Sequence, residues 1–254
     1  MPEFRVFTDF AYADHPRAQI DLIVPSGSTR APLVFCVHGG GWSGGHRLQY
    51  ALTGFELANR GFASALIGYP LMPDRLWPQM GYDVYAAAAW IKSNAGEYGI
   101  DASRMVTWGS SAGAQLTLAL HAFADDWKAA GAVRGDCPAI IGSVAHCVAF
   151  DLISYESENR RRFMGNASPE TVSPAHIEPS RFRSIFVAHS KPDRLFPSQA
   201  VLSWVERLKA AGVDADVYIS DSGEHGYLYN IISDDARSAF DASVGYLKRI
   251  FKKA

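Results

Sequence analysis

The chain has 254 residues, of which 48% are hydrophobic and 20% are charged, and its formal net charge is −2. This composition predicts one globular domain over residues 1–254 with a large core, because α/β chains of about 200–250 residues are routinely single domains. The near-neutral charge balance excludes a strongly basic surface, so we expect no nucleic-acid partner.

The termini and the cysteines bear on where the protein resides. No run of about 18 apolar residues occurs, so we expect no membrane span. The first residues, Met1-Pro2-Glu3-Phe4-Arg5, lack the basic-then-apolar pattern of a signal peptide. Cys36, Cys137 and Cys147 form an odd set without disulfide spacing. We therefore expect a cytoplasmic protein with free thiols.

Hydrophobic patterning predicts eight strands that alternate with helices. The expected strands lie at residues 5–10, 19–24, 33–37, 63–67, from 105, 140–148, 185–189 and 217–219, and the expected helices at 49–60, 82–94, from 112 to about 123, 197–211 and 234–251. Alternation from residue 33 onward implies a mainly parallel sheet with helices on both faces. In such sheets, functional sites lie at the carboxyl ends of the strands.

The stretch Gly109-Ser110-Ser111-Ala112-Gly113 lies between an expected strand and an expected helix. This is the context that a nucleophile elbow needs, whereas the pattern alone could arise by chance in a glycine-rich turn. The sharp turn would leave no room for side chains at Gly109 and Gly113. We therefore predict Ser111 as a catalytic nucleophile.

The stretch His38-Gly39-Gly40-Gly41-Trp42 follows the buried strand at 33–37. Consecutive glycines expose backbone N–H groups that can donate to a negative oxygen, although a ligand-free turn is the alternative. Next to a nucleophile elbow, we assign the oxyanion donors to the N–H groups of Gly40, Gly41 and Ala112. His38 is expected to hold this loop rather than to act as the base.

The general base is expected after the last strand. His225 lies there in a glycine-flanked loop, and His189, which ends a strand, is the best-placed rival. The acid is expected between the nucleophile and the histidine. Asp193 follows the strand at 185–189, so we predict Ser111, His225 and Asp193 as a catalytic triad for acyl transfer.

Other carboxylates remain as alternatives to Asp193. Asp151 follows an earlier strand, and Asp221 and Glu224 lie near His225. Asp193 could instead cap the helix that begins near residue 197. No cluster of His, Cys, Asp and Glu has the spacing of metal ligands, so we expect no metal and no cofactor.

These motifs resemble a known family, the hormone-sensitive-lipase-like and feruloyl-esterase-like carboxylesterases of the α/β-hydrolase fold. The resemblance rests on residues 38–42 and 109–113, and further matches are Tyr69-Pro70-Leu71-Met72-Pro73, Asp83, Ala87-Ala88-Ala89-Trp90-Ile91, Ile100-Asp101-Ala102-Ser103-Arg104, Ser173-Pro174, Asp193 and Glu224-His225-Gly226. It implies an α/β-hydrolase fold with a mostly parallel, twisted eight-stranded sheet, helices on both faces and a minimal cap.

The chain departs from the family pattern in two places. Ser190 follows His189, where the family usually has glycine. Only about 20 residues precede the first matching strand, so the long N-terminal cap of hormone-sensitive-lipase-like members is not expected. The short-capped branch, which includes feruloyl esterases and kynurenine formamidases, is the better match.

The substrate is predicted less sharply than the chemistry. Residues 151–183 are polar and expected to be mostly irregular, a small lid insertion that cannot cover a large lipid site. We expect an open pocket for short-chain or aromatic esters. Trp42, Tyr69 and Trp77 lie in loops that should approach it and are the candidates for binding the substrate, and the alternative is that they pack in the core and the turns. A formyl amide, as in kynurenine formamidase, is the alternative substrate, and a non-catalytic binding module is the alternative function. Nothing in the sequence decides between a monomer and a homodimer.

Overall fold

The structure is a computed structural model, and it describes residues 4–253. Eight strands form one sheet in the order β1-β2-β4-β3-β5-β6-β7-β8. The strands are β1 (Phe4–Ala11), β2 (Gln19–Pro25), β3 (Ala31–Val37), β4 (Ala63–Ile67), β5 (Ile100–Ser110), β6 (Ala139–His146), β7 (Ser184–Ser190) and β8 (Asp214–Ser220). Pairing is antiparallel from β1 to β4 and parallel from β4 through β3 to β8. The predicted mostly parallel, eight-stranded sheet is confirmed.

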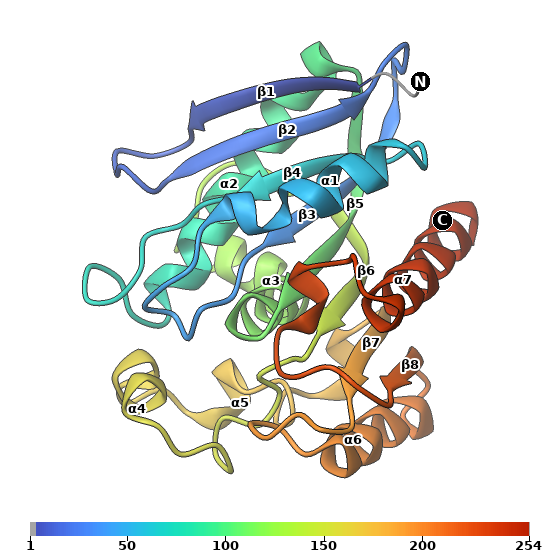
Figure 1. The fold of residues 1–254 in the computed structure, drawn as a ribbon. Coiled ribbons are helices and arrows are strands. Elements are labelled where there is room, and N and C mark those ends of the chain that lie inside the picture. Colours follow the sequence, from blue (N-terminus) through green and yellow to red (C-terminus); the bar gives the residue numbers. More distant parts are fainter. Residues whose placement is uncertain (1–3, 254) are drawn as a thin grey trace.

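Helices cover both faces of the sheet (Figure 1). The α-helices are α1 (Ala51–Ala58), α2 (Gln79–Asn94), α3 (Ala112–Ala129), α4 (Glu158–Met164), α5 (Pro169–Val172), α6 (Ser198–Ala210) and α7 (Asp234–Lys253), and the 3₁₀ turns are η1 (Arg47–Tyr50), η2 (Ala95–Tyr98), η3 (Pro179–Arg181) and η4 (Tyr227–Tyr229). One core cluster packs α2, α3 and α6 against the sheet, and a second packs α1 and α7 against its other face. The central strands are therefore buried on both sides, which explains their continuous apolar sequence.

Two expected element boundaries differ from those of the structure by more than three residues. β5 begins at Ile100 rather than Met105, because Ile100 and Asp101 pair with Ala31 and Pro32 of β3 before a register shift at Leu33. α3 continues to Ala129, beyond the expected end near residue 123. Trp127, which is buried, extends the apolar face of this helix by one more turn.

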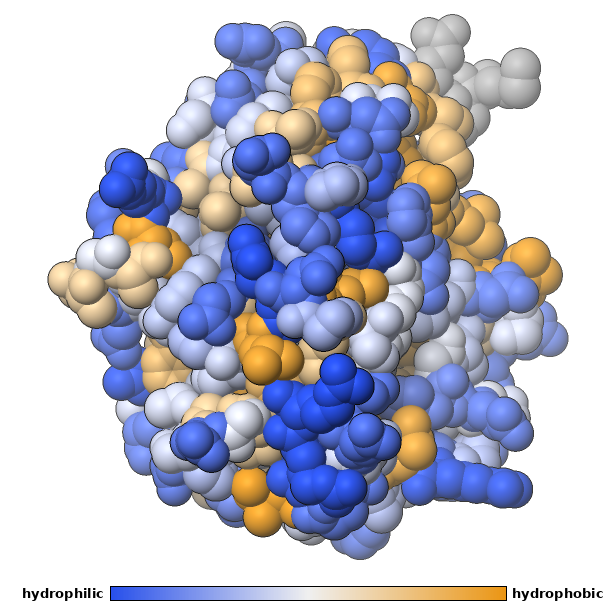
Figure 2. Space-filling model, turned by 90° about the vertical axis from the view of Figure 1, so that its left-hand side faces the viewer, coloured by the Kyte–Doolittle hydropathy of each residue, from blue (hydrophilic) through white to orange (hydrophobic). Residues whose placement is uncertain are grey.

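The segment 151–183 is more ordered than expected. It contains α4 and α5, and it buries Phe163, Met164 and Val172 in the core. A few well-spaced apolar side chains thus suffice to anchor a segment whose average composition is polar. Figure 2 shows a face on which hydrophilic residues predominate and hydrophobic residues form separate small groups.

No helix within residues 4–253 is both long and apolar enough to cross a membrane. The chain's three cysteines are free thiols, two of them buried. The predicted absence of a disulfide is therefore consistent with the structure.

Two histidines outside the predicted triad are buried, His121 on α3 and His146 at the end of β6. The Nδ1 atom of His121 lies 2.8 Å from Ser143 Oγ, and the Nε2 atom of His146 lies 3.0 Å from Ser243 Oγ. Burial lowers the pKa of each imidazole to about 3, and the nearby Arg183 contributes for His121. Both rings are therefore neutral in the folded chain at neutral pH.

These histidines predict that acid destabilises the fold. In the unfolded chain they take up protons below about pH 6.5, whereas the folded chain resists protonation until about pH 3. The unfolded state binds more protons in this window, so the free energy of unfolding falls as the pH decreases. We expect a loss of about 4 kcal/mol between pH 7 and pH 5 from the two groups together, measured by urea unfolding.

The matched variant for this prediction is His146→Gln, which keeps a polar group opposite Ser243 and removes one proton site. Its loss of unfolding free energy between pH 7 and pH 5 should be smaller than that of the natural chain by about 2 kcal/mol, whatever its stability at pH 7. Equal pH dependence in the variant and the natural chain would contradict the role of His146.

Candidate active site

Ser111 lies between β5 and α3 in a strained turn. Its φ and ψ angles are 54° and −122°, a combination that residues with a side chain rarely adopt. A Cβ atom at Gly109 would lie 2.6 Å from the nitrogen of Ala114, and one at Gly113 would lie 2.1 Å from the carbonyl oxygen of Val37. Both positions therefore need glycine, and the turn directs Ser111 over the carboxyl end of the sheet with α3 beginning immediately after it.

The structure brings Ser111, His225 and Asp193 together. The Nε2 atom of His225 lies 2.7 Å from Ser111 Oγ, and its Nδ1 atom lies 2.7 Å from Asp193 Oδ2. Ser111 follows β5, His225 follows β8 and Asp193 follows β7, and the carboxyl ends of these parallel strands share one edge of the sheet. A carboxylate can only accept, so the imidazole donates from Nδ1 and its Nε2 is free to accept the serine proton.

The carboxylate of Asp193 is held by the backbone that follows it. Its Oδ1 atom accepts hydrogen bonds from the N–H groups of Leu195, at 2.9 Å, and Phe196, at 3.1 Å, which leaves Oδ2 for His225. Burial acts to raise the pKa of Asp193, but the hydrogen bonds and charges of His225, Phe196 and His189 outweigh it and lower this pKa. The group is therefore a carboxylate at neutral pH.

The rival acids lie in other interactions. Asp221 is exposed and pairs with Lys191. Asp151 accepts from the backbone of Ile153 at 3.0 Å and lies 3.3 Å from His176. Among the described residues, neither carboxylate contacts His225.

His189, the alternative candidate for the base, lies next to Asp193 and is fully buried. Its Nε2 atom lies 2.7 Å from the carbonyl oxygen of Phe196, to which it donates, and 3.7 Å from Asp193 Oδ2. Burial lowers its pKa. His189 is thus bonded to the backbone of the acid loop, whereas His225 is the histidine that contacts Ser111.

One cluster of side chains that could hold a metal ion is visible only in the structure. Cys147, His189 and Asp193 offer ligand atoms that lie within 4.8 Å of one another, although Cys147 is far from the other two in the sequence. Burial raises the pKa of the Cys147 thiol to about 12, so it stays protonated. His189 Nε2 and both oxygens of Asp193 already have protein partners. Spacing along the sequence therefore did not reveal this cluster, and its contacts favour a structural role for it.

The glycine loop after β3 borders the same site. Gly40 has a φ angle of 118° and Gly41 one of 58°, and a Cβ at Gly40 would lie 2.4 Å from the carbonyl oxygen of Gly44. Within residues 4–253 the N–H groups of Gly40 and Gly41 donate no hydrogen bond to the chain. The N–H of Ala112 belongs to the first turn of α3, where helical amides have no partner within the helix. These three groups are the donors expected for an oxyanion, and that role remains a prediction.

His38 braces the glycine loop. Its Nδ1 donates to the carbonyl oxygen of Gly39 at 2.7 Å, and its ring stacks on Tyr69 with the centroids 4.5 Å apart. Burial lowers the pKa of His38 to about 4. The N–H of Gly39 donates to the hydroxyl of Tyr229 at 2.5 Å. This geometry is that of a structural histidine.

A cavity of about 300 Å³ opens beside Ser111. Its lining comprises Gly40, Gly41, Trp42, Gln49, Ser111, Ala112, Ala149, Tyr155, Leu195, Phe196, His225, Gly226 and Tyr229. Among the described residues, the ionisable side chains in this lining are His225 and the two tyrosines, Tyr155 and Tyr229. A small, neutral and largely apolar group fits such a space.

Only one of the three predicted substrate-binding aromatics lines this cavity. Trp42 does so, whereas Tyr69 is fully buried beneath His38, with its hydroxyl donating to the His38 carbonyl at 2.7 Å. Trp77 lines a different cavity. The expectations for Tyr69 and Trp77 are therefore corrected, because loop position alone does not tell which way a side chain turns.

Several lining residues were missed in the sequence. Leu195, Phe196 and Tyr229 lie within a few positions of the predicted acid and base, so adjacency to Asp193 and His225 could have indicated them. Tyr155 comes from the insertion 151–183. Nothing in its local sequence separates it from a surface tyrosine.

The insertion holds the glycine loop from outside. Phe163 of α4 stacks on Trp42 with the ring centroids 4.4 Å apart and the planes 10° from parallel. Asn159 Nδ2 donates to Ser43 Oγ at 2.9 Å. The indole of Trp42 donates to Gln115 Oε1 at 3.0 Å, which ties the loop to α3 as well. The insertion is thus a wall of the site rather than a separate unit.

Comparisons with known proteins agree with this architecture. Residues 20–139 match the family model described as BD-FAE. The chain is 27% identical over 266 residues to a probable isoprenylcysteine alpha-carbonyl methylesterase of Oryza sativa subsp. japonica, covering 93% of this chain and 60% of the relative. It is 27% identical over 215 residues to esterase LipQ of Mycobacterium tuberculosis, covering 77% and 50% respectively. The chain therefore spans about half to three-fifths of the length of these curated relatives.

Solved structures extend the likeness to the whole fold. Esterase B from Lactobacillus rhamnosis superposes with a TM-score of 0.84 at 17% identity, covering 98% of this chain and 87% of that one. Carboxyl esterase 2 from Tuber melanosporum gives a TM-score of 0.80 at 20% identity, covering 98% and 88%. The chain therefore has the fold of these esterases, as the motifs predicted.

Close packing at the elbow predicts opposite effects for two glycine substitutions. Gly113→Ala would force a Cβ into the Val37 and His38 carbonyls, so we expect a loss of about 2–4 kcal/mol in the free energy of unfolding. Gly245→Ala is the control, because no atom lies within 4 Å of its added Cβ and it occupies the interior of α7. It should stabilise the fold by about 0.5–1 kcal/mol. Equal stabilities for the two variants in urea unfolding would show that the close approach at Gly113 is misplaced.

Proposed function

We propose that this α/β-hydrolase chain is a serine carboxylesterase that cleaves short-chain or aromatic carboxylic esters through an acyl-enzyme on Ser111. The observation that carries the proposal is the continuous hydrogen-bonded series from Ser111 through His225 to Asp193, beside three N–H groups that have no partner within residues 4–253. Relatives named as esterases and methylesterases support the same enzyme class.

The first half of the reaction forms the acyl-enzyme. Ser111 Oγ attacks the ester carbonyl carbon while His225 Nε2, 2.7 Å away, takes the hydroxyl proton. Asp193 stabilises the resulting imidazolium and holds its orientation. The N–H groups of Gly40, Gly41 and Ala112 donate to the tetrahedral oxyanion, each such donor typically stabilising the transition state by about 3–4 kcal/mol. His225 then returns the proton to the departing alcohol as the carbon–oxygen bond breaks.

The second half releases the acid. Water attacks the acyl-enzyme and gives its proton to His225, and the tetrahedral intermediate collapses with return of that proton to Ser111 Oγ. The products are a carboxylic acid and the regenerated hydroxyl. No step requires a metal or a cofactor.

The size and lining of the cavity support a small acyl group. Its volume of about 300 Å³ lies at the lower end of the range for small-molecule pockets. Trp42, Leu195 and Phe196 offer apolar surface, and Leu195 is 42% exposed at the mouth. By name, the plant relatives act on methyl esters, and one esterase B structure was inhibited by a tributyrin phosphonate. The methyl ester substrates and the phosphonate inhibitor of these proteins both support carboxylic ester cleavage as the reaction proposed for this chain.

The test compares hydrolysis of p-nitrophenyl acetate, butyrate and octanoate with that of N-formylkynurenine. We expect kcat/KM for acetate and butyrate to exceed that for octanoate by at least tenfold, because the cavity holds only a short chain. A formamide rate above all three esters would instead identify a formamidase. Rates that rise steadily with chain length would contradict the short-acyl assignment, and inactivity on all four substrates would favour a binding module.

Variants test the residue roles in the same assay. Ser111→Ala should abolish turnover, and Asp193→Asn should lower kcat by about 10³–10⁴, because the amide no longer holds the histidine tautomer. Asp221→Asn is the matched control, since Asp221 is exposed and pairs with Lys191. It should stay within twofold of the natural chain. A loss in Asp221→Asn as large as that in Asp193→Asn would overturn the choice of acid.

A further inference from the structure

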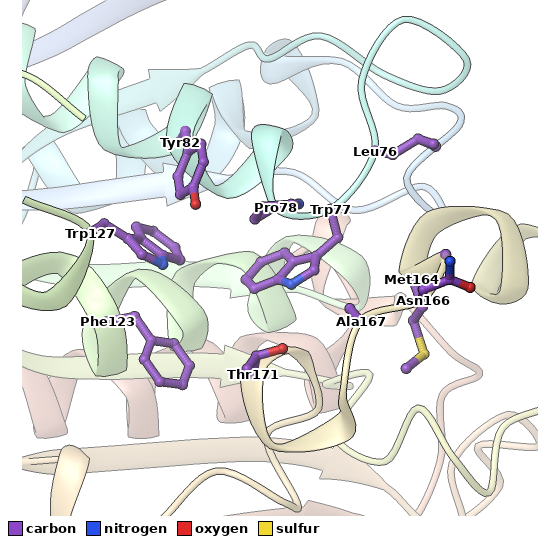
Figure 3. Close-up of a pocket in the computed structure, with 11 residues that line it drawn as sticks. Leu76, Trp77, Pro78, Tyr82, Phe123, Trp127, Met164, Asn166, Ala167 and Thr171 are labelled. Atoms are coloured by element: carbon purple, nitrogen blue, oxygen red, sulfur yellow. The ribbon is translucent and has the colours of Figure 1, made fainter. Parts of the chain in front are cut away.

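A second and larger cavity lies away from Ser111. It has a volume of about 500 Å³ and lies between α2, the last turns of α3 and the α4–α5 segment (Figure 3). Its lining shares no residue with the lining of the catalytic cavity. Phe123 in its wall lies 12 residues beyond Ser111, which at the rise of an α-helix corresponds to about 18 Å along α3.

An aromatic partition separates the two cavities. Phe163 stacks on Trp42, which faces the catalytic cavity, and it meets Trp77 edge to face with the centroids 6.0 Å apart. Trp77 faces the second cavity. A substrate held at Ser111 therefore does not account for the second cavity.

The chemistry of the second cavity indicates what it would bind. The rings of Trp77, Tyr82, Phe123 and Trp127 form much of its wall, and no charged side chain lines it among the described residues. Such walls favour a flat, neutral group over a charged one, because a charge would lose its hydration without gaining a partner. The volume is sufficient for a fused bicyclic ring system.

Polar atoms in the wall add a second criterion. Figure 3 shows the Tyr82 hydroxyl and the indole nitrogens of Trp77 and Trp127 turned toward the space between these side chains. Within residues 4–253, the hydrogen bonds of indole and phenol groups involve other tryptophans and tyrosines, so none joins these three groups to the chain. Indole N–H groups only donate, and a tyrosine hydroxyl readily does so. The ligand should therefore carry hydrogen-bond acceptors.

We propose that this cavity is a second ligand site for a neutral, flat aromatic compound that carries acceptor oxygens. The inference does not depend on esterase activity, because it rests on the shape and polarity of a space that the reaction at Ser111 does not use. The ligand is a small molecule, and the Tyr82 hydroxyl donates a hydrogen bond to one of its acceptor oxygens.

The experiment measures binding of coumarin and naphthalene by ligand-observed NMR titration. Both are flat bicycles of similar size, but only coumarin has acceptor oxygens. The protein carries Ser111→Ala, so that the coumarin lactone cannot be opened at the catalytic serine. In this background Tyr82→Phe removes the hydroxyl and keeps the ring. We expect it to weaken coumarin about fivefold and to leave naphthalene within twofold.

Two tryptophan substitutions locate the site. Thr171 is an exposed residue at the rim of the second cavity, and Leu195 is a partly exposed residue at the rim of the catalytic one. Thr171→Trp should weaken coumarin at least tenfold, whereas Leu195→Trp should leave its affinity within twofold. Circular dichroism checks that both variants are folded.

The outcomes divide cleanly. Loss of coumarin binding with Leu195→Trp but not Thr171→Trp would place the compound in the catalytic cavity and overturn the proposal. Equal weakening of coumarin and naphthalene by Tyr82→Phe would overturn the donor role of Tyr82. Absence of coumarin binding at concentrations up to about 1 mM would also overturn the proposal, because a dissociation constant above that value corresponds to very weak binding.

Discussion

The strained turn at Ser111 is the constraint on which the rest of the site depends. Its positive φ angle persists only because β5, α3 and the end of β3 surround it closely. Gly113 lies against the carbonyls of Val37 and His38, so the nucleophile turn and the start of the glycine loop are packed backbone to backbone. One close approach thus positions both the attacking oxygen and the N–H groups proposed to stabilise the oxyanion.

The remaining catalytic groups depend on buried supports rather than on the loops alone. Asp193 is fixed by the backbone of Leu195 and Phe196, and the carbonyl of Phe196 in turn accepts from His189. Buried groups that are hydrogen-bonded in this way keep their rotamers, which is what a preorganised site requires. On the opposite side, Phe163 and Trp42 hold the glycine loop by stacking. The site therefore has a rigid polar side and a rigid aromatic side.

The sequence predicted the parts of the fold that follow simple patterns. Buried strands read as apolar runs, and the elbow at Ser111 carries a local steric demand that only glycine meets at Gly109 and Gly113. His225 and Asp193 were placed by strand order, since parallel strands end at one edge of the sheet. Each of these predictions depends on local chemistry or on topology.

The sequence did not predict features that depend on side-chain direction or on contacts between distant segments. Tyr69 and Trp77 lie in the expected loop but turn away from Ser111. Cys147 approaches Asp193 only through the folding of β6 beside β7. The early start of β5 was hidden because polar residues at a strand end pair through their backbone.

The most direct test of the proposed mechanism is covalent labelling of the nucleophile. Diisopropyl fluorophosphate transfers its phosphoryl group to an activated serine with loss of fluoride, and the adduct can be counted by intact mass and located by peptide mapping. We predict one adduct per chain on Ser111, with a labelling rate that falls at least 100-fold in His225→Ala. A label on another residue, or an unchanged rate in His225→Ala, would contradict activation of Ser111 by His225.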